Sequence, residues 1–541
     1  MNQINNQYQV TKLKIFNVRG VLMTKNDSIH PKNIKEVILG DHELSINEVI
    51  AVARYGAKVS FTENYYLRIN KSRNLIEKFL EEERAVYGVT TGFGSNVTEV
   101  ISKEDAHTLQ RNIVRSHAVS VGDPLEKEVV RAIQLMVLNN IGQGYSGVRI
   151  EVLELIASIL NHDILPFVPG EGSVAYLSPE AHMALVLMGE GKAWYKDELL
   201  SGHEALERAG LIPVTFECKE GLALLSGTTS ATAFAVLSIY NAIQAVKTAD
   251  ITGAMSLEAL KGTIKALDPR LHSVKKHVEQ AKTARIVSKI LDGSEIAKQY
   301  KDYRLQDALS LRCIPQVHGA VKKILKNALE NIHNEMMSSS DNPIIWPEEE
   351  DGLALMGGNF DASYLGIDAD TICIGMANLA KITERRIDRL VNYHVSELPS
   401  FLVVNPGLNS GYMIPQYTAV GLLNEIRVLS HPATIDNTST CANQEDVVSF
   451  AYFAARKAYQ ISKKLEHILA IELMVATQAL EFHDSLKPSP VTASVYQLIR
   501  NQVPAVKEDR YFYHDIETIR NQIHDGDIVE LVEEKIGVME L

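Results

Sequence analysis

Three long stretches rich in alanine, isoleucine, valine and leucine constrain the fold of this chain more than any other feature. They cover residues 231–257, 372–390 and 447–480 and contain few helix breakers. In the third stretch an apolar stripe recurs at helical spacing, formed by Leu465, Leu469, Leu473, Ala476 and Leu480. Helices this long, with apolar faces on more than one side, predict an all-α bundle that neighbouring copies of the chain complete.

Composition narrows the class of partner. The 541 residues carry a formal net charge of -13, which disfavours a nucleic acid or an anionic membrane as the partner. Apolar residues make up 46% of the chain, enough for a large core, and no linker rich in proline, glycine or serine divides it. We therefore expect one large helical unit that acts on a small molecule.

The four cysteines, Cys218, Cys313, Cys373 and Cys441, lie far apart in the sequence. Their spacing does not match a zinc site, a redox pair or a disulfide framework, so we expect reduced, buried thiols and no metal. The first residues lack the basic and then apolar pattern of a signal peptide, and no apolar run of about 18 residues predicts a membrane span. We expect a cytoplasmic protein.

A glycine-rich segment over residues 86–94 predicts a loop that approaches a ligand closely. It contains Tyr87, which has few neighbours in sequence to pack against and is therefore a candidate for chemistry rather than for packing. Ahead of it, Leu44-Ser45-Ile46-Asn47 gives a helix-capping signal, with Ile46, Val49 and Ile50 at helical spacing.

The segment over residues 169–191 has an unusual centre and familiar flanks. Gly172-Ser173-Val174 and the run Ala181-His182-Met183-Ala184-Leu185-Val186-Leu187 resemble the signature of the histidine/phenylalanine ammonia-lyase family. The resemblance extends from about Val37 to Asp484. Further landmarks of the family pattern are Ser338-Ser339-Ser340-Asp341-Asn342-Pro343, Gly357-Gly358-Asn359-Phe360, Pro406-Gly407-Leu408-Asn409-Ser410-Gly411 and Asn443-Gln444-Glu445-Asp446.

This resemblance implies an all-α, ammonia-lyase-like fold, a fumarase/aspartase-like long helical bundle with a loop-rich N-terminal active-site domain. It also implies a homotetramer whose sites combine loops of more than one subunit. On this basis we expect an N-terminal extension of unassigned role over residues 1–36, an active-site domain over 37–230, the long-helix bundle over 231–484 and a C-terminal helical segment over 485–541.

The family signature normally encloses an Ala-Ser-Gly tripeptide that cyclises into a methylidene-imidazolone electrophile. Here the span is three residues shorter and the tripeptide is absent. Ring closure needs a backbone nitrogen after the serine to attack the preceding carbonyl, and glycine makes that attack sterically easy. Ser173 is followed by β-branched Val174, and Ser178 by Pro179, which has no N–H. We therefore predict that the protein works without this cofactor, unless the loop has merely drifted.

The family's site positions divide into two sets. On the side of the electrophile, the usual asparagine is Ser226 and a usual tyrosine is Leu309. The positions that hold the carboxylate, the ring and the departing proton remain. They are Tyr87, His117, Gln306, Arg312, Phe360, Gln444 and Glu445. Decay by chance would not sort positions by role, which favours a changed activity over a lost one.

The resemblance assigns roles to these residues. Tyr87 is the base, once nearby donors or cations lower its pKa, while Arg312 holds the carboxylate and Glu445 polarises the ring. We expect substrate contacts from a further set: His117, Tyr176, Ser226, Gln306, Asn359, Phe360 and Gln444. Each has a plainer interpretation, such as a structural ion pair for Arg312, a hydrogen-bonded structural histidine for His117 and a solvated acid for Glu445.

A site that lacks the electrophile suits a substrate whose nitrogen is already a fixed cation, because such a nitrogen leaves directly as a neutral amine. The sequence hypothesis is therefore a cofactor-free lyase of the ergothionase type, which eliminates trimethylamine from a histidine-derived betaine such as ergothioneine and gives thiourocanate. Tyr176, with Tyr87 or Phe360, would present aromatic faces to the cation.

Three alternatives remain open at this point. The first is an ordinary histidine ammonia-lyase, which the missing electrophile disfavours. The second is a lyase or isomerase that acts on another imidazole or aromatic acid. The third is a non-catalytic member of the family that serves as a scaffold or regulator.

Overall fold

Three long helices pack against one another and form the centre of the molecule. They are α9 (Thr229–Ala259), α15 (Ser363–Val391) and α18 (Ala451–Leu480), with 31, 29 and 30 residues. The structure is a computed structural model and describes residues 29–541 apart from 93, 95–100, 102–104, 349–350 and 484. The all-α prediction is confirmed: the stretches 231–257 and 372–390 lie within α9 and α15, and α18 covers the third stretch from Ala451 onward.

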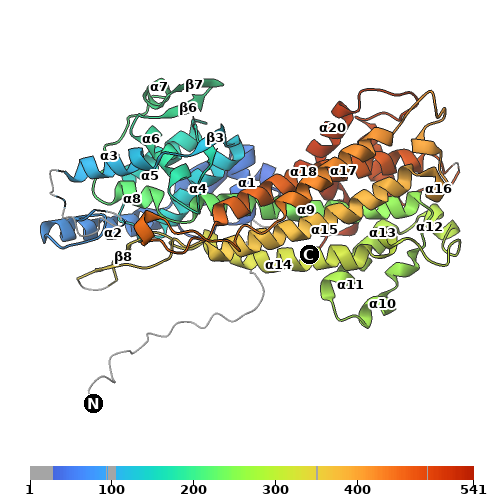
Figure 1. Cartoon of the computed structure of the whole chain (residues 1–541), viewed down its shortest axis with the longest axis horizontal. Helices are drawn as coiled ribbons and strands as arrows, with labels where there is room; N and C mark the ends of the chain where they lie inside the picture. Colours follow the sequence, from blue (N-terminus) through green and yellow to red (C-terminus); the bar gives the residue numbers. More distant parts are fainter. Residues whose placement is uncertain (1–28, 93, 95–100, 102–104, 349–350, 484) are drawn as a thin grey trace, which may run out of the picture.

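Two further long helices flank the central three. α14 (Ile314–Met336) packs on α9 and α15, and α17 (Met413–Leu429) packs on α15 and α18. Short elements cap the end of the bundle that lies on the right of Figure 1. They include η4 (Ile264–Leu267), α10 (Pro269–Ser273), α11 (Val278–Ile290), α12 (Glu295–Gln299), α13 (Leu309–Arg312), α16 (Tyr393–Ser396) and η5 (Ser400–Leu402). Three C-terminal helices pack along the bundle: α19 (Pro490–Arg500), α20 (Tyr513–His524) and α21 (Asp527–Ile536).

The N-terminal elements gather at the other end of the long helices (Figure 1). The helical ones are η2 (Pro31–Asn33), α1 (Ile46–Tyr55), α2 (Glu63–Glu81), α3 (Ala106–His117), α4 (Lys127–Gly142), α5 (Ile150–Asn161), α6 (Ser178–Leu187), α7 (Gly202–Arg208) and α8 (Glu220–Leu225). Ser45 begins α1 with the predicted capping box, in which it exchanges hydrogen bonds with Glu48.

Within the part of the chain that the structure describes, the strands are short and form four small sheets. β1 (Glu36–Leu39) pairs in parallel with β2 (Lys58–Phe61), and all other pairs are antiparallel. These are β3 (Val121–Pro124) with β5 (Pro169–Glu171), β4 (Leu165–Pro166) with β6 (Lys192–Tyr195) and then β7 (Glu198–Ser201), and β8 (Ile344–Trp346) with β9 (Leu353–Leu355). β5 leads into the shortened segment at the candidate site.

Burial along α18 is wider than the sequence pattern predicts. The five residues of the predicted stripe are buried, but so are Ile468, Ile471 and Val475 between them. The helix is therefore buried on all sides over this part because α9 and α15 both pack on it. The predicted stripe is therefore buried, but it is only part of the buried surface of α18.

Several charged side chains in the bundle interior form ion pairs. Asp250 lies 2.8 Å from His318 and 2.6 Å from Lys322, and all three side chains are fully buried. Arg386 and Glu472 form a second fully buried ion pair. Such pairs satisfy each other's hydrogen bonds where water is excluded.

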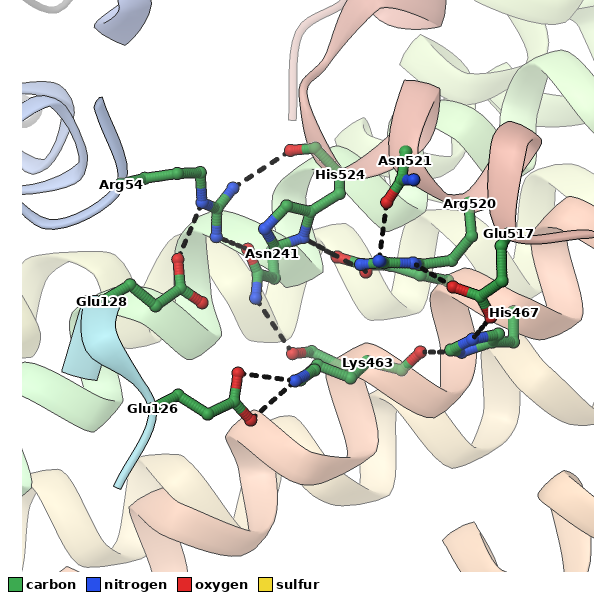
Figure 2. Close-up of polar contacts among 12 residues, drawn as sticks. Arg54, Glu126, Glu128, Asn241, Lys463, His467, Glu517, Arg520, Asn521 and His524 are labelled. Carbon is green, nitrogen blue, oxygen red and sulfur yellow. Dashed lines mark hydrogen bonds and ion pairs between the residues drawn. The ribbon is translucent and has the colours of Figure 1, made fainter. Parts of the chain in front are cut away.

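A network of polar contacts joins the N-terminal unit to the bundle and to α20 (Figure 2). Arg54 of α1 lies 2.8 Å from Glu128 of α4, and it donates hydrogen bonds to Asn241 of α9 and to the carbonyl oxygen of His524. Lys463 of α18 reaches Glu126 at 2.6 Å. These contacts hold together parts of the chain that are far apart in sequence.

Two sequence predictions need correction here. Cys218 and Cys373 are buried, but Cys313 is half-buried and Cys441 is exposed, so burial does not describe all four thiols.

The helical run Glu220–Ala259 is long and apolar enough to cross a membrane by length and composition, although no such run was expected. Its most apolar window is entirely buried inside the protein, as in the core helix of a bundle.

Candidate active site

The shortened segment forms a tight turn between β5 and α6. Gly172 and Leu177 take positive φ values of 102° and 79°, and the Ser173 hydroxyl donates a hydrogen bond to the carbonyl oxygen of Tyr176 at 3.1 Å. Ser178 begins α6 and contacts the Ser120 hydroxyl at 2.7 Å. The turn buries Tyr176, which is 7% exposed, so that its ring becomes part of the wall of the site.

Tyr176 links two other predicted site residues. Its ring meets the Phe360 ring edge to face, with centroids 5.2 Å apart and planes at 74°. Its hydroxyl group is hydrogen-bonded to the carboxylate of Glu445. Burial raises the pKa of Tyr176, and the charges of Glu445 and Asp361 raise it further. Tyr176 is therefore a neutral donor in this site.

Tyr87 lies in the turn over residues 87–90, as the glycine-rich pattern predicts. Its hydroxyl oxygen accepts a hydrogen bond from the Gly94 backbone N–H at 2.8 Å. Burial raises the pKa of Tyr87, and the nearby Cys441 and Glu445 also raise it, whereas the Gly94 N–H lowers it. A lowered pKa of Tyr87 was expected for its role as base, and that expectation is wrong. The phenol needs an additional cation before it can act as a base.

His117 is the last residue of α3. Its Nδ1 lies 2.8 Å from the Ile113 carbonyl oxygen and 3.0 Å from the Ser116 hydroxyl. A carbonyl oxygen can only accept, so Nδ1 carries the proton, and Nε2 of the neutral ring is an acceptor. Burial lowers the pKa of His117, although the charge of Glu445 acts in the opposite direction.

Glu445 is held by a strained loop. The Thr440 hydroxyl donates to Oε2 of Glu445 at 2.8 Å, and the Thr440 N–H donates to the Glu445 carbonyl oxygen at the same distance. Between them, Cys441, Ala442 and Asn443 have φ values of 51°, 54° and 66°. Three successive residues in the left-handed region are costly for non-glycine side chains. This loop turns the Glu445 carboxylate toward Tyr87, His117 and Tyr176.

The remaining predicted contacts are less central. Ser226 is buried at the end of α8, and Gln444 is exposed beside Glu445. Asn359 is exposed, and its side-chain amide donates to the Ser339 carbonyl oxygen at 3.3 Å. Among the residues that the structure describes, no group of three or more histidines, cysteines, aspartates or glutamates gathers as a metal site would.

Arg312 and Gln306 do not meet the other residues within one chain. Arg312 ends α13, and the 23 residues of α14 lie between it and the loop that leads to Phe360. A helix of that length spans about 34 Å. Figure 1 shows α13 at the end of the bundle opposite to α3 and α6. Nε of Arg312 is buried without a hydrogen-bond partner, and Gln306 is exposed.

The residues present do not fit the family's electrophile. In the shortened turn the only serines precede valine and proline. Leu225-Ser226-Gly227, nearby, has the required glycine, but Ser226 is extended, with φ of −75° and ψ of 143°. A five-membered ring through this residue needs both torsions near 0°, so the Gly227 nitrogen points away from the Leu225 carbonyl carbon.

Sequence reasoning missed three contributors to this site. Thr440 anchors Glu445, Cys441 lies against Gly94 next to Tyr87, and the charge of Asp361 acts on Tyr176. Asp361 follows Phe360 directly, and Thr440 and Cys441 lie within five residues of Glu445. Their only sequence signal was this proximity to family landmarks.

Comparison with known proteins gives one consistent family. The model of the aromatic amino acid lyase family matches residues 44–501. Histidine ammonia-lyase of Caldanaerobacter subterraneus subsp. tengcongensis is 43% identical over 509 residues, which cover 94% of this chain and 100% of that protein.

Solved structures agree with this match. The structure of histidine ammonia-lyase from Trypanosoma cruzi is similar with a TM-score of 0.87 and 34% identity, covering 93% of this chain and 96% of that one. Ergothionase from Treponema denticola is similar with a TM-score of 0.83 and 27% identity, covering 91% of this chain and 99% of that one. The predicted ammonia-lyase fold is confirmed.

These matches contradict the hypothesis of a lyase that eliminates trimethylamine from ergothioneine. A relative named histidine ammonia-lyase shares 43% of its residues with this chain along its full length, whereas ergothionase shares only 27%. The missing tripeptide therefore does not by itself identify a quaternary amine as the leaving group. The imidazole ring was expected from the residues that face it, whereas the quaternary amine was expected only because the tripeptide is absent.

Proposed function

The chain belongs to the aromatic amino acid lyase family, a family of carbon–nitrogen lyases, and on that premise we propose that it removes the α-amino group of histidine or of a closely related imidazole amino acid. The cluster of Tyr87, His117, Tyr176 and Glu445 carries this proposal. The charge of Glu445 acts on each of the other three.

An imidazole ring fits the polar groups of this cluster. Nε2 of His117 is an acceptor, and the Glu445 carboxylate is an anionic acceptor. A protonated imidazole offers two N–H donors on opposite sides of the ring, and the two acceptors match them. The edge-to-face pair of Tyr176 and Phe360 supplies an aromatic wall.

The same ring cation would activate Tyr87. Glu445 raises the pKa of Tyr87, so a cation bound to Glu445 removes part of that effect. The Gly94 N–H already points at the phenol oxygen and stabilises a phenolate. Tyr87 then takes the β-proton, the bond from the α-carbon to the protonated amino group breaks with its electron pair going to nitrogen, and a carbon–carbon double bond forms. The products are ammonia and the corresponding acrylate.

We propose further that a second copy of the chain supplies Arg312 to hold the substrate carboxylate, in a homotetramer. Arg312 lies about one α14 length, roughly 34 Å, from this cluster in its own chain. Large apolar side chains lie exposed on α15 and α17, as an interface between copies requires: Tyr364, Ile367, Ile374, Ile414, Tyr417 and Val420. The cytoplasmic location, the domain boundaries and the absence of a cofactor also stay predictions.

The test is to mix the purified protein with L-histidine and to follow ammonia together with the absorbance of a conjugated acrylate. Production of both, and their loss in Tyr87→Phe, would support the proposal. Formation of a β-amino acid would instead indicate an isomerase.

A second candidate is a non-catalytic family member that only binds imidazole acids, which the misfit of the electrophile favours. Isothermal titration with imidazolepropionate separates the two. Binding without turnover of any imidazole amino acid would support the second candidate. The absence of both binding and turnover would contradict both.

A further inference from the structure

A fully buried ion pair lies outside the cluster just described. Nζ of Lys219 and Oδ2 of Asp341 are 2.6 Å apart, and both side chains are 0% exposed. Lys219 immediately precedes α8, and Asp341 lies in the segment after α14. Neither group can reach solvent or a substrate, so the pair does not take part in the chemistry directly.

Lys219 has two energetically unfavourable features, its backbone conformation and the burial of its charge. Its φ of 74° is left-handed, a conformation that costs a non-glycine residue on the order of 1 kcal/mol. Its ammonium group is buried, and replacing a buried ion pair by apolar side chains of similar size is often neutral or even stabilising. Stability alone does not explain a residue with both costs, and such residues often position a functional site.

Hydrogen bonds lead from this pair to the aromatic wall. Oδ1 of Asp341 accepts from the Asn342 N–H at 2.7 Å, and Oδ1 of Asn342 accepts from the Gly357 N–H at 3.0 Å. The Asn359 amide donates to the Ser339 carbonyl oxygen at 3.3 Å. The segment beside Asp341 is thus tied twice to the residues just before Phe360, whose ring contacts Tyr176.

The same segment is fixed on its other side. The Ser340 N–H donates to Oδ1 of Asn140 at 2.8 Å, and the Ser340 hydroxyl accepts from the Thr228 N–H at 3.1 Å. A Cβ atom on Gly227 would lie 2.7 Å from that hydroxyl oxygen, so the contact leaves no room for a side chain at this position. These contacts fix the position of the segment that contains Ser340 and Asp341, and the Lys219–Asp341 pair anchors the same segment.

We propose that Lys219 and Asp341 are positioning residues that hold Phe360 against Tyr176 and so set the width of the ring pocket. The inference rests on the proposed function for its kinetic consequences, but its structural consequence does not. Lys219 acts through Asp341, through the segment 339–342 and through the loop 357–360 that this segment contacts. It does not touch the substrate.

The first variant is Lys219→Met/Asp341→Leu, which removes both charges while keeping apolar volume. We expect it to fold with a melting temperature near that of the parent. Hydrogen exchange at the amides of Gly357 and Asp361 should rise at least tenfold, because the segment that holds the loop before Phe360 is no longer anchored. The kcat for the imidazole amino acid should fall at least tenfold, with a smaller change in KM.

Lys322→Met is a matched control for the single variant Lys219→Met. Lys322 also has a fully buried ammonium group 2.6 Å from an aspartate, Asp250, but it lies in the bundle interior. Both single variants should lose stability, and only Lys219→Met should loosen Gly357 and Asp361. Adding Phe360→Ala to the Lys219→Met/Asp341→Leu variant should cause no further loss of kcat, because both changes act on the same contact.

Unchanged exchange at Gly357 and Asp361 in the Lys219→Met/Asp341→Leu variant would overturn the proposal, as would equal loosening in Lys322→Met. Full additivity with Phe360→Ala would overturn it as well. If the parent protein turns over no imidazole amino acid, the proposed function fails, and the exchange measurement still decides the positioning role.

Discussion

The long-helix bundle and the candidate site treat the backbone in opposite ways. Within α9, α15 and α18 no described residue has a positive φ, and buried ion pairs such as Asp250–Lys322 and Arg386–Glu472 join neighbouring helices. The site loops contain non-glycine residues in the left-handed region at Leu177, Lys219 and the run 441–443. The backbone of the bundle thus keeps the conformations that its residues prefer locally, whereas the backbone of the site departs from them.

This difference shows where each part obtains its stability. A helix of about thirty residues gains from every turn that it buries, so propensity and packing agree. A loop that holds three residues in the left-handed region is stable only because its surroundings impose that shape. The bundle supplies this rigidity, and the site uses it to orient Glu445. Substitutions should therefore act mainly on stability in the bundle and mainly on activity in the site.

The largest expected effect is that of Tyr87→Phe in the site. Loss of a general base typically lowers turnover by about 10²–10⁴-fold. The lost hydrogen bond from Gly94 should cost about 1 kcal/mol or less of the free energy of unfolding. Steady-state kinetics with L-histidine and urea unfolding of the same samples measure both. A variant that keeps its turnover would remove Tyr87 from the role of base.

Arg386→Met in the bundle should show the reverse pattern. Its guanidinium group is fully buried against Glu472, so removal of one partner leaves a buried, uncompensated carboxylate. The expected cost is about 3–5 kcal/mol of unfolding free energy. Turnover per folded molecule should stay near that of the parent.

The double variant Arg386→Met/Glu472→Leu is the control, and it should recover most of the lost stability. If the double variant were as unstable as the single one, packing rather than charge would explain the loss.

The sequence was sufficient to predict the parts of the fold that follow local preference. The three long helices and the capping box of α1 were readable because apolar spacing and capping residues determine them locally. Burial of α18 on all sides could not be predicted in this way, because it depends on two partner helices that the sequence pattern of α18 does not reveal. The contacts of Arg54 with Glu128 and Asn241 join segments far apart in the chain, and no spacing rule indicates them.

The candidate site divides in the same way. Tyr87, His117, Phe360 and Glu445 were named because they match family landmarks, and the structure brings them to one end of the molecule. The direction of the Tyr87 pKa was wrong because it depends on burial and on Glu445, which is 358 positions further along the chain. Thr440 was missed because its role is a contact across a turn that no local preference predicts.

A smaller effect is expected from pH, at the junction of the N-terminal unit and the bundle. Burial alone would raise the pKa of Glu128, but Arg54 and other donors hold it below its ordinary value. A lowered folded pKa stabilises the protein above the unfolded value of 4.5, and this contribution is lost as the pH falls through the folded pKa. Glu128→Gln should therefore cost about 1.5–3 kcal/mol at pH 6 and much less near pH 3.

Urea unfolding of Glu128→Gln and the parent at both pH values measures this difference. Glu517→Gln is the matched control, because Glu517 also lies in the Figure 2 network but is half-exposed, at 28% of its side chain. Its effect should be smaller at pH 6. A cost for Glu128→Gln that is the same at both pH values would show that the Arg54 contact does not depend on the charge.

The smallest effect, and the sharpest test of the contrast between site and bundle, comes from one substitution made in both places. Ala442→Gly relieves a left-handed alanine, with a φ of 54°, in the loop that holds Glu445. The relief of about 1–2 kcal/mol exceeds the entropic cost of glycine, so the variant should gain about 0.5–1 kcal/mol of unfolding free energy. Ala377→Gly in α15 should lose about 1 kcal/mol, because the helix already favours alanine.

Thermal and urea unfolding of the two variants should therefore move in opposite directions. Turnover should fall modestly in Ala442→Gly, because a freer loop holds the Glu445 carboxylate less firmly, and it should not change in Ala377→Gly. If both variants lost stability equally, the positive φ values at residues 441–443 would carry no strain. The orientation of Glu445 would then depend on its hydrogen bonds to Thr440 alone.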